Sequence, residues 1–138
     1  MHVLVETGKN LDHDCEDSVD PLIKVKFMGM SKTTGSKSKI TKSTLVTWDE
    51  HLFFDTPKLE KEEIESAIIE IEILNKGFFS SDLIGRFPVS ATTIYNLDKH
   101  TVHNQTLSFT NPEAENKSKI TGNISVSIQL TGPDDESL

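Results

Sequence analysis

The sequence predicts an all-β fold, an eight-stranded antiparallel β-sandwich with short helical insertions, and three observations support this prediction. Apolar and polar residues alternate with a period of two in several short segments, most clearly at residues 22–27, 69–73 and 122–131. Polar and turn-forming stretches separate these segments at short intervals, which is typical of antiparallel sandwiches. The chain shows no repeated strand–helix–strand pattern, so a parallel sheet is not expected.

The expected strands are short and are separated by glycine, proline or polar loops. Near the start of the chain, Ile23, Val25 and Phe27 alternate with two lysines, as in a strand that is buried on one face. Pro88 has no backbone N–H to donate, so the end of its strand is expected at a sheet edge. In chain order, the expected strands are residues 3–6, 22–27, 31–34, 47–55, 69–73, 83–89, 106–109 and 122–131.

Two helical segments are expected between these strands. Residues 59–67 are acidic with scattered apolar positions, which is typical of a short surface helix. Thr56 suits the N-cap of that helix, and Pro57 suits its first helical position. Residues 92–95 are expected to form a single helical turn.

The composition indicates one domain over residues 1–131, followed by an acidic tail or linker at residues 132–138. The formal net charge of −8 argues against a general nucleic-acid binder. A single cysteine, Cys15, excludes an internal disulfide and fits a reducing, cytoplasmic compartment. Residues 2–11 carry no long apolar run, so no signal peptide is expected. No stretch approaches the roughly 18 apolar residues of a membrane-spanning helix.

Lysines are concentrated in one part of this acidic chain. Residues 21–47 contain six lysines and no acidic residue, which predicts a local positive surface. Such a surface attracts anionic lipid, because each lysine near an anionic membrane contributes ~1 kcal/mol. The alternative is a solvated sheet edge that lysines protect from aggregation. The six candidate residues are Lys24, Lys26, Lys32, Lys37, Lys39 and Lys42.

Three short motifs, in this order, show a family resemblance. They are Asp-Pro at 20–21, Thr-Trp-Asp-Glu at 47–50 and Asp-Leu-Ile-Gly at 82–85. Together they resemble the C2 domain, a calcium- and lipid-binding β-sandwich, over nearly the whole chain. The resemblance implies that Phe78 and Phe79, at the tip of the predicted loop after residue 73, insert into a membrane or contact a partner. The alternative is that one or both fold back over the end of the sandwich.

The C-terminal third is most similar to the second C2 domain of ferlins, which are multi-domain membrane-fusion and repair proteins. The motifs are Leu-Ile-Gly-Arg-Phe at 83–87, Asn-Pro-Glu at 111–113 and Gly-Pro-Asp-Asp-Glu at 132–136. Similar ferlin segments have aspartate where this chain has Asn111, and glycine where it has Asp134.

The resemblance also implies where calcium would bind, and the residues there are incomplete. The first loop supplies Asp14 and Asp20, but the motif positions of the third loop are Leu74, Lys76 and Asp82. Calcium takes roughly six to eight oxygen ligands, and Asp14, Asp20 and Asp82 alone leave the site deficient. No cofactor is therefore expected, and we hypothesise that the Lys76 ammonium neutralises one of these aspartates in place of a metal.

The predicted function is a non-catalytic C2 module that binds an anionic phospholipid membrane or phosphoinositide, largely without calcium. It would belong to a ferlin-like membrane-trafficking or fusion protein, on the cytoplasmic side and peripheral to a membrane in which the larger protein is anchored. No nucleophile–base arrangement, phosphate-binding glycine loop or catalytic carboxylate pair is found, so no enzyme activity is expected. The alternative is a protein–protein interaction domain that docks through the Phe78–Phe79 tip or the lysines.

Overall fold

The structure, a computed structural model, describes residues 1–13, 16–56 and 59–130. Within these ranges it contains eight strands, all paired antiparallel, and two short α-helices, so the predicted all-β sandwich is confirmed. The strands are β1 His2–Lys9, β2 Pro21–Phe27, β3 Met30–Thr33, β4 Val46–Phe53, β5 Ile68–Lys76, β6 Ser81–Ser90, β7 Thr101–Thr110 and β8 Ile120–Gln129.

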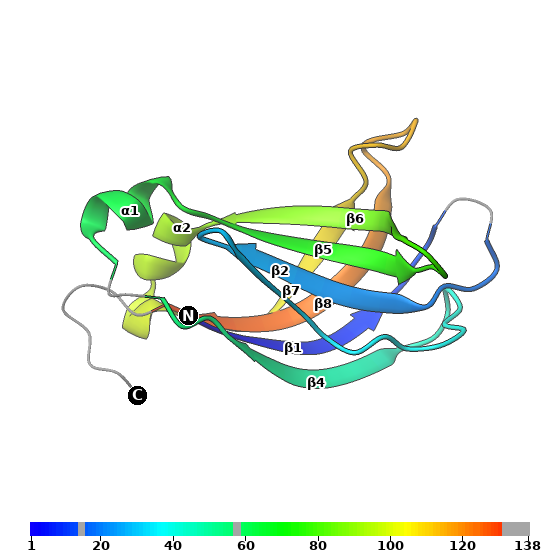
Figure 1. The fold of residues 1–138 in the computed structure, drawn as a ribbon, viewed down its shortest axis with the longest axis horizontal. Coiled ribbons are helices and arrows are strands. Elements are labelled where there is room, and N and C mark those ends of the chain that lie inside the picture. Colours follow the sequence, from blue (N-terminus) through cyan, green and yellow to red (C-terminus); the bar gives the residue numbers. More distant parts are fainter. Residues whose placement is uncertain (14–15, 57–58, 131–138) are drawn as a thin grey trace.

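The hydrogen-bonded strand order is β3-β2-β5-β6-β7-β8-β1-β4. Between β6 and β7 a single residue pair, Arg86 with Thr110, is recorded in the described part of the chain. The sheet folds at this weak joint into two four-stranded layers, which Figure 1 shows packed one over the other. The expected edge position of Pro88 is confirmed, because β6 beyond Arg86 pairs with β5 alone.

The two layers enclose one hydrophobic core, and the alternation in the sequence accounts for it. In β2 and β5, every second side chain points between the layers and is fully buried, whereas its neighbours point outward. Strands β1 and β8 supply the facing side chains in the same way. The fully or almost fully buried strand residues include Val3, Val5, Ile23, Val25, Phe27, Ile69, Ile71, Ile73, Ile124, Val126 and Ile128.

Helix α1 begins two residues later than expected, and helix α2 begins one residue earlier. Helix α1 spans Lys61–Ser66, and its N-cap is Glu60 rather than Thr56. The Glu60 backbone N–H donates to the Glu63 carboxylate at 3.0 Å, so an acidic side chain stabilises the first turn. Pro57 lies outside the described residues. Helix α2 spans Ala91–Tyr95, and a 3₁₀ turn (η1) follows at Asp98–His100.

Several strands begin or end at other residues than predicted, and the contacts of β7 and β3 explain two of these differences. Strand β7 starts five residues before the expected segment at 106–109, because polar residues there pair with β8 through their backbone across a bulge. Strand β3 ends at Thr33, since the buried Thr34 leaves the ladder and its hydroxyl accepts the Ile23 N–H at 3.0 Å. Residues 131–138, which include the predicted tail, lie outside the described part of the chain.

The loops β1–β2, β3–β4, β5–β6 and β7–β8 lie at one end of the sandwich, to the right in Figure 1. Helices α1 and α2 and the N-terminus lie at the opposite end. None of the helices in the described ranges has the length and apolar character required to span a bilayer. The end that carries the loops holds the predicted tip and the aspartates, and we refer to it as the loop end.

Candidate functional site

The β5–β6 hairpin places two aromatic rings in solvent at the loop end. Lys76 pairs with Ser81, so the connection between the strands is only residues 77–80. Phe78 and Phe79 are each 99% exposed, and their ring centroids lie 6.0 Å apart at a tilt of 50°. Neither ring folds back over the sandwich. Two fully exposed phenylalanines on one hairpin tip are ready to enter an apolar environment.

The tightness of this turn explains the residue that precedes the phenylalanines. A side chain at Gly77 would overlap the backbone oxygen of Ser80, so only glycine fits there without moving the turn. At the base of the hairpin's second strand, a Cβ at Gly85 would lie 2.6 Å from the Thr121 hydroxyl and 2.9 Å from the Phe109 Cβ. The glycine of the Asp-Leu-Ile-Gly motif therefore allows β6 to pack closely on β7 and β8.

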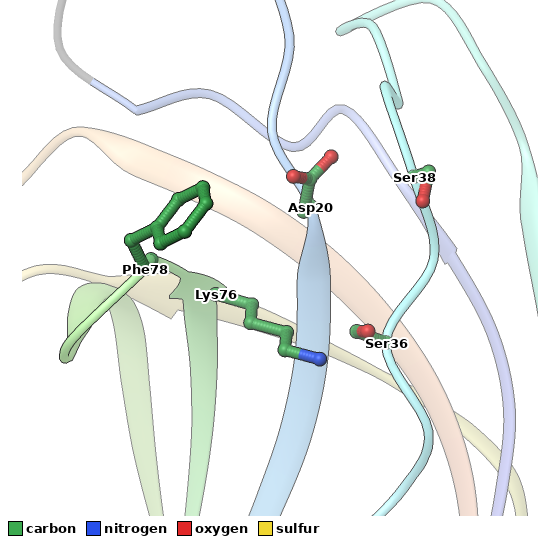
Figure 2. Close-up of a pocket in the computed structure, with 6 residues that line it drawn as sticks. Asp20, Ser36, Ser38, Lys76 and Phe78 are labelled. Atoms are coloured by element: carbon green, nitrogen blue, oxygen red, sulfur yellow. The ribbon is translucent and has the colours of Figure 1, made fainter.

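A pocket of about 400 Å³ opens directly beneath the tip, between the β5–β6 hairpin and the β3–β4 loop. Figure 2 shows the Lys76 side chain extending across the end of β2 toward Ser36, with Ser38 farther along the same loop. The Asp20 carboxylate points away from the Lys76 ammonium in this view. The pocket is lined by Asp20, Ser36, Ser38, Lys76, Gly77 and Phe78.

Asp20 connects three segments at the loop end through its own hydrogen bonds. Its Oδ1 accepts the backbone N–H of Lys39 at 2.7 Å, and its backbone N–H donates to the Asn75 side chain at 2.8 Å. The Asp20 carbonyl oxygen accepts the Lys76 N–H at 2.9 Å. These bonds hold the start of β2, the β3–β4 loop and the end of β5 together.

The described residues at this end do not fit the calcium ion that the C2 resemblance implies. One Asp20 oxygen already accepts a backbone N–H, and Lys76 brings positive charge into the same pocket. Asp82 is exposed and is paired with Asn75 in the hairpin ladder, and Asp14 lies outside the described residues. In the described ranges, no three acidic, histidine or cysteine side chains are placed to hold a metal.

The hypothesis that Lys76 neutralises an aspartate is not supported at the two described positions, Asp20 and Asp82. Among the described residues, the ion pairs within 4.0 Å do not include Lys76 with either carboxylate. The Lys39 N–H takes the role at Asp20 that was predicted for the ammonium. The backbone of the β3–β4 loop therefore orients the Asp20 carboxylate without a cation. The Lys76 ammonium points into the pocket.

The six lysines of residues 21–47 do not share one face. Lys24 and Lys26 point outward from β2, whereas Lys32 is paired with the inward-facing Val25 and lies on the other side of the sheet. Lys42 forms an ion pair with Asp12 at 3.4 Å. Lys37 and Lys39 lie in the β3–β4 loop, next to the two pocket serines.

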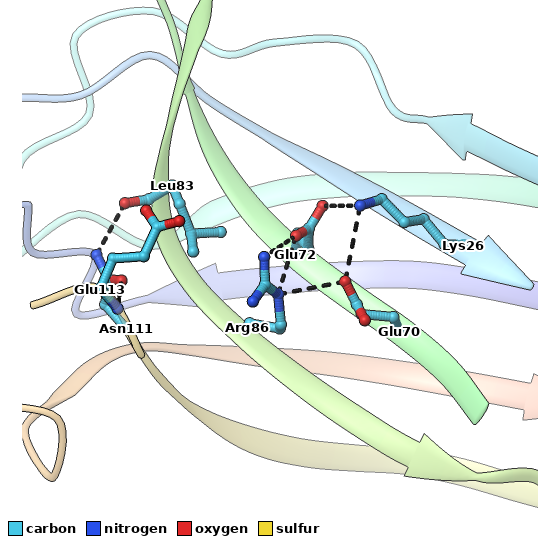
Figure 3. A network of polar contacts seen from close by, with 7 residues as sticks. All are labelled: Lys26, Glu70, Glu72, Leu83, Arg86, Asn111 and Glu113. Carbon is cyan, nitrogen blue, oxygen red and sulfur yellow. Dashed lines mark hydrogen bonds and ion pairs between the residues drawn. The ribbon is translucent and has the colours of Figure 1, made fainter.

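Lys26 belongs to a charge network on the outer face of the β2–β5–β6 strands, shown in Figure 3. Its ammonium lies 3.2 Å from Glu72 and 3.7 Å from Glu70. Arg86 adds contacts of 2.8 Å to Glu72 and 3.2 Å to Glu70. Burial opposes ionisation of Glu72, but hydrogen bonds from Arg86 and Lys26 outweigh it and lower its pKa below the ordinary 4.5. We call these four residues the strand-face network.

Sequence reasoning missed this network and the two pocket serines. Glu70 and Glu72 were recognised only as the polar half of an alternating strand, and register alone places them opposite Lys26, Lys24 and Arg86. Ser36 and Ser38 lie in a polar segment without apolar periodicity, which was predicted only as a loop or an exposed edge. The alternation of serine and lysine over residues 36–39 was the available signal, since it distributes hydroxyls and charges along one loop.

Asn111, where similar ferlin segments have aspartate, has a structural role in the β7–β8 loop. Its side-chain N–H donates to the Leu83 carbonyl at 3.0 Å, and its Oδ1 accepts the Glu113 N–H at 2.9 Å. Figure 3 shows this contact beside the strand-face network. The amide can donate and accept at once, which an ionised aspartate cannot do.

Comparison with solved structures shows what this architecture is similar to. A C2 domain of a plant extended synaptotagmin 1 is 18% identical with a TM-score of 0.64, over 91% of this chain and 88% of that one. A C2 domain-containing protein from a putative elicitor-responsive gene is 15% identical with a TM-score of 0.70, over 99% and 90%. The tandem C2 domains of extended synaptotagmin 2 give 15% and 0.67, over 91% and 36%.

At these identities, similarity to solved structures shows the fold alone. No curated protein sequence matches this chain. The family model of the C2 domain matches residues 1–109, which is most of the chain. The chain therefore belongs to the C2 domain family.

Proposed function

We propose that this C2 domain binds an anionic phospholipid membrane through its loop end and does so without calcium. C2 domains are in general membrane- and phospholipid-binding modules. The observation that carries the proposal is the pair Phe78 and Phe79, each 99% exposed at the tip of a tight hairpin, directly above Lys76. An apolar tip with a cation beneath it matches the order of groups in a membrane, acyl chains inside and phosphates outside.

Two forces contribute to binding in this orientation. Full burial of one phenylalanine side chain is worth ~1.5–3 kcal/mol, so two partly inserted rings give a modest apolar contribution. Lysines close to an anionic surface add ~1 kcal/mol each. Lys76 lies in the pocket beneath the tip, and Lys37 and Lys39 belong to the β3–β4 loop that lines the same pocket through Ser36 and Ser38, so the apolar and electrostatic terms act together.

Calcium independence is part of the proposal and rests on the donor set of the loops. Lys76 and Leu74 stand at motif positions where calcium-binding relatives need carboxylates, and Asp20 is committed to the Lys39 N–H. The ferlin-like context also stays a prediction, since it depends on sequence motifs of which residues 132–136 lie outside the described part. In that context the domain is a non-catalytic, membrane-peripheral module on the cytoplasmic side of a larger anchored protein.

The test is co-sedimentation with vesicles of phosphatidylcholine, alone or mixed with phosphatidylserine or phosphatidylinositol phosphates, in calcium or in chelator. We expect binding to anionic vesicles that is equal in both conditions. The double variant Phe78→Ala with Phe79→Ala should weaken it by at least about tenfold. Phe53→Ala is the matched control, because Phe53 is also an exposed phenylalanine, 60% accessible, but lies on strand β4 away from the tip.

Three outcomes would contradict this proposal. Binding that requires calcium would remove the calcium-independent part. Equal losses for the tip variant and for Phe53→Ala would show that the tip has no special role. No binding to any vesicle would favour the alternative, a protein partner docked on the same apolar tip, for which high salt should leave affinity unchanged.

A further inference from the structure

The pocket beneath the tip contains a cation whose charge is not balanced by a described neighbour. Among the residues that the structure describes, the recorded ion pairs leave out Lys76, although its ammonium lies in a pocket with Asp20. The Asp20 carboxylate is oriented away from it and is held by the Lys39 N–H. The ammonium is instead directed toward Ser36 (Figure 2).

We infer that Lys76, Ser36 and Ser38 form a binding site for the phosphate group of an anionic lipid head group. An ammonium offers three donors and no acceptor, and each serine hydroxyl can donate one more hydrogen bond. A phosphate accepts several such bonds, and those from a charged donor are the strongest. The three side chains thus present donors from the end of β5 and from the β3–β4 loop to one volume.

The size and position of the pocket suit this ligand. Its volume of about 400 Å³ falls in the range of roughly 300–1,000 Å³ that is usual for small-molecule sites. Phe78 lines the same pocket, so a head group bound by Lys76 would lie next to a ring that enters the acyl region. This inference rests on the proposed function, because it assigns the head group of the membrane that the tip enters.

Substitutions at Asp20 and Lys76 should change phosphate affinity in opposite directions. Its carboxylate lines the pocket and repels a phosphate, although Lys39 donates one hydrogen bond to it. The substitution Asp20→Asn keeps an oxygen that can accept the Lys39 N–H while it removes the negative charge. A phosphate site should therefore bind more tightly in Asp20→Asn and more weakly in Lys76→Gln. If the pocket bound calcium instead, its calcium affinity would fall in Asp20→Asn and rise in Lys76→Gln.

The experiment follows the full 138-residue chain by amide NMR during titration with inorganic phosphate and with soluble inositol monophosphate. A parallel arm measures affinity for phosphatidylcholine vesicles containing phosphatidylinositol monophosphate. We expect amide shifts at residues 36–38 and 76–78 in the soluble titrations. In both arms Lys76→Gln should lower affinity about fivefold, and Asp20→Asn should raise it by a similar factor. Lys61→Gln, the same charge change on α1 at the other end, should leave affinity unchanged.

The outcomes separate this inference from the proposed function. If Lys76→Gln and Lys61→Gln behave alike while the Phe78–Phe79 variant loses vesicle binding, the phosphate site is wrong and the membrane function stands. If phosphate and inositol monophosphate bind at Lys76 but the vesicles do not bind, the lipid assignment is wrong. If Asp20→Asn lowers the affinity for both the soluble phosphates and the vesicles, the pocket is not an anion site. Retained dispersion of the amide spectrum shows that each variant is folded.

Discussion

Lysines at two places in this domain have opposite surroundings. On the strand face, Lys26 lies 3.2 Å from Glu72 and 3.7 Å from Glu70, and Arg86 contacts the same two glutamates. At the loop end, the recorded ion pairs of the described residues leave Lys76 without a carboxylate within 4.0 Å. Lys26 is part of a charge-compensated network, whereas the positive charge of Lys76 can still attract an anionic ligand.

This difference shows that lysine density does not by itself define a binding surface. Residues 21–47 contain six lysines, yet cross-strand register neutralises Lys26, and Asp12 neutralises Lys42. Glu72 is only 4% exposed, so its pairing with Arg86 and Lys26 is a condition for burying it. The strand-face network therefore contributes to stability, and the proposed membrane contact is at the loop end.

The largest expected effect comes from breaking the strand-face network. Glu72→Ala should lower the free energy of unfolding by about 2–3 kcal/mol, because two cations lose a buried partner but can still reach water. Glu70→Ala is the matched control, and its loss should stay below about 1 kcal/mol since Glu70 is 34% exposed. Urea unfolding measures both. Equal losses would mean that burial of Glu72 is not what makes the network matter.

The next effect separates binding from stability. Lys37→Gln with Lys39→Gln should weaken binding to anionic vesicles by roughly tenfold or more, since each lysine near the surface contributes ~1 kcal/mol. Unfolding should be nearly unchanged, because the Asp20 contact uses the Lys39 backbone. Lys26→Gln should lower the free energy of unfolding and leave binding to anionic vesicles nearly unchanged. A larger binding loss for Lys26→Gln would place the membrane surface on the strand face instead.

The pH dependence of stability should reveal the strand-face network in the unsubstituted protein. The pKa of Glu72 lies below its ordinary value of 4.5 in the folded state, despite burial, because Arg86 and Lys26 stabilise the charged form. Stability from this group is complete above that ordinary value and decreases as pH falls through the folded pKa. Urea unfolding from neutral pH downward should show this decrease. In Glu72→Gln the slope should be shallower, with a remainder from Asp12, whose pKa Lys119 and Lys42 also lower.

The smallest expected effect lies where the loop end is partly compensated. Asp12 pairs with Lys119 at 2.9 Å and with Lys42 at 3.4 Å, and both lysines are more than half exposed. Asp12→Asn should cost less than about 1 kcal/mol of stability, because both lysine partners are largely exposed and stay solvated without the carboxylate. It should also strengthen vesicle binding several-fold by releasing the two lysines. Unchanged binding in co-sedimentation would show that these lysines do not face the membrane.

Much of the fold followed from local pattern. The alternation in residues 22–27 and 69–73 predicted β2 and β5, and the loop that follows was predicted to carry Phe78 and Phe79 at its tip. The sequence left open whether these rings fold back over the sandwich, and the structure places both in solvent. The N-cap at Thr56 was wrong, because the Glu60–Glu63 pair a few residues later stabilises the helix start. Local signals identify elements more reliably than their ends, since several nearby residues compete for each end.

The partners of charged residues did not follow from local pattern. Sequence alone determined the alternating strands, the glycine turn with its phenylalanine tip, and the presence of Lys76 where a calcium ligand would be needed. Only the tertiary structure decided that Lys26 is neutralised, that Lys32 faces the other side of the sheet, and that Lys76 shares a pocket with Ser36. Strand register and loop packing bring together residues far apart in the chain, and no periodicity within one segment encodes that pairing.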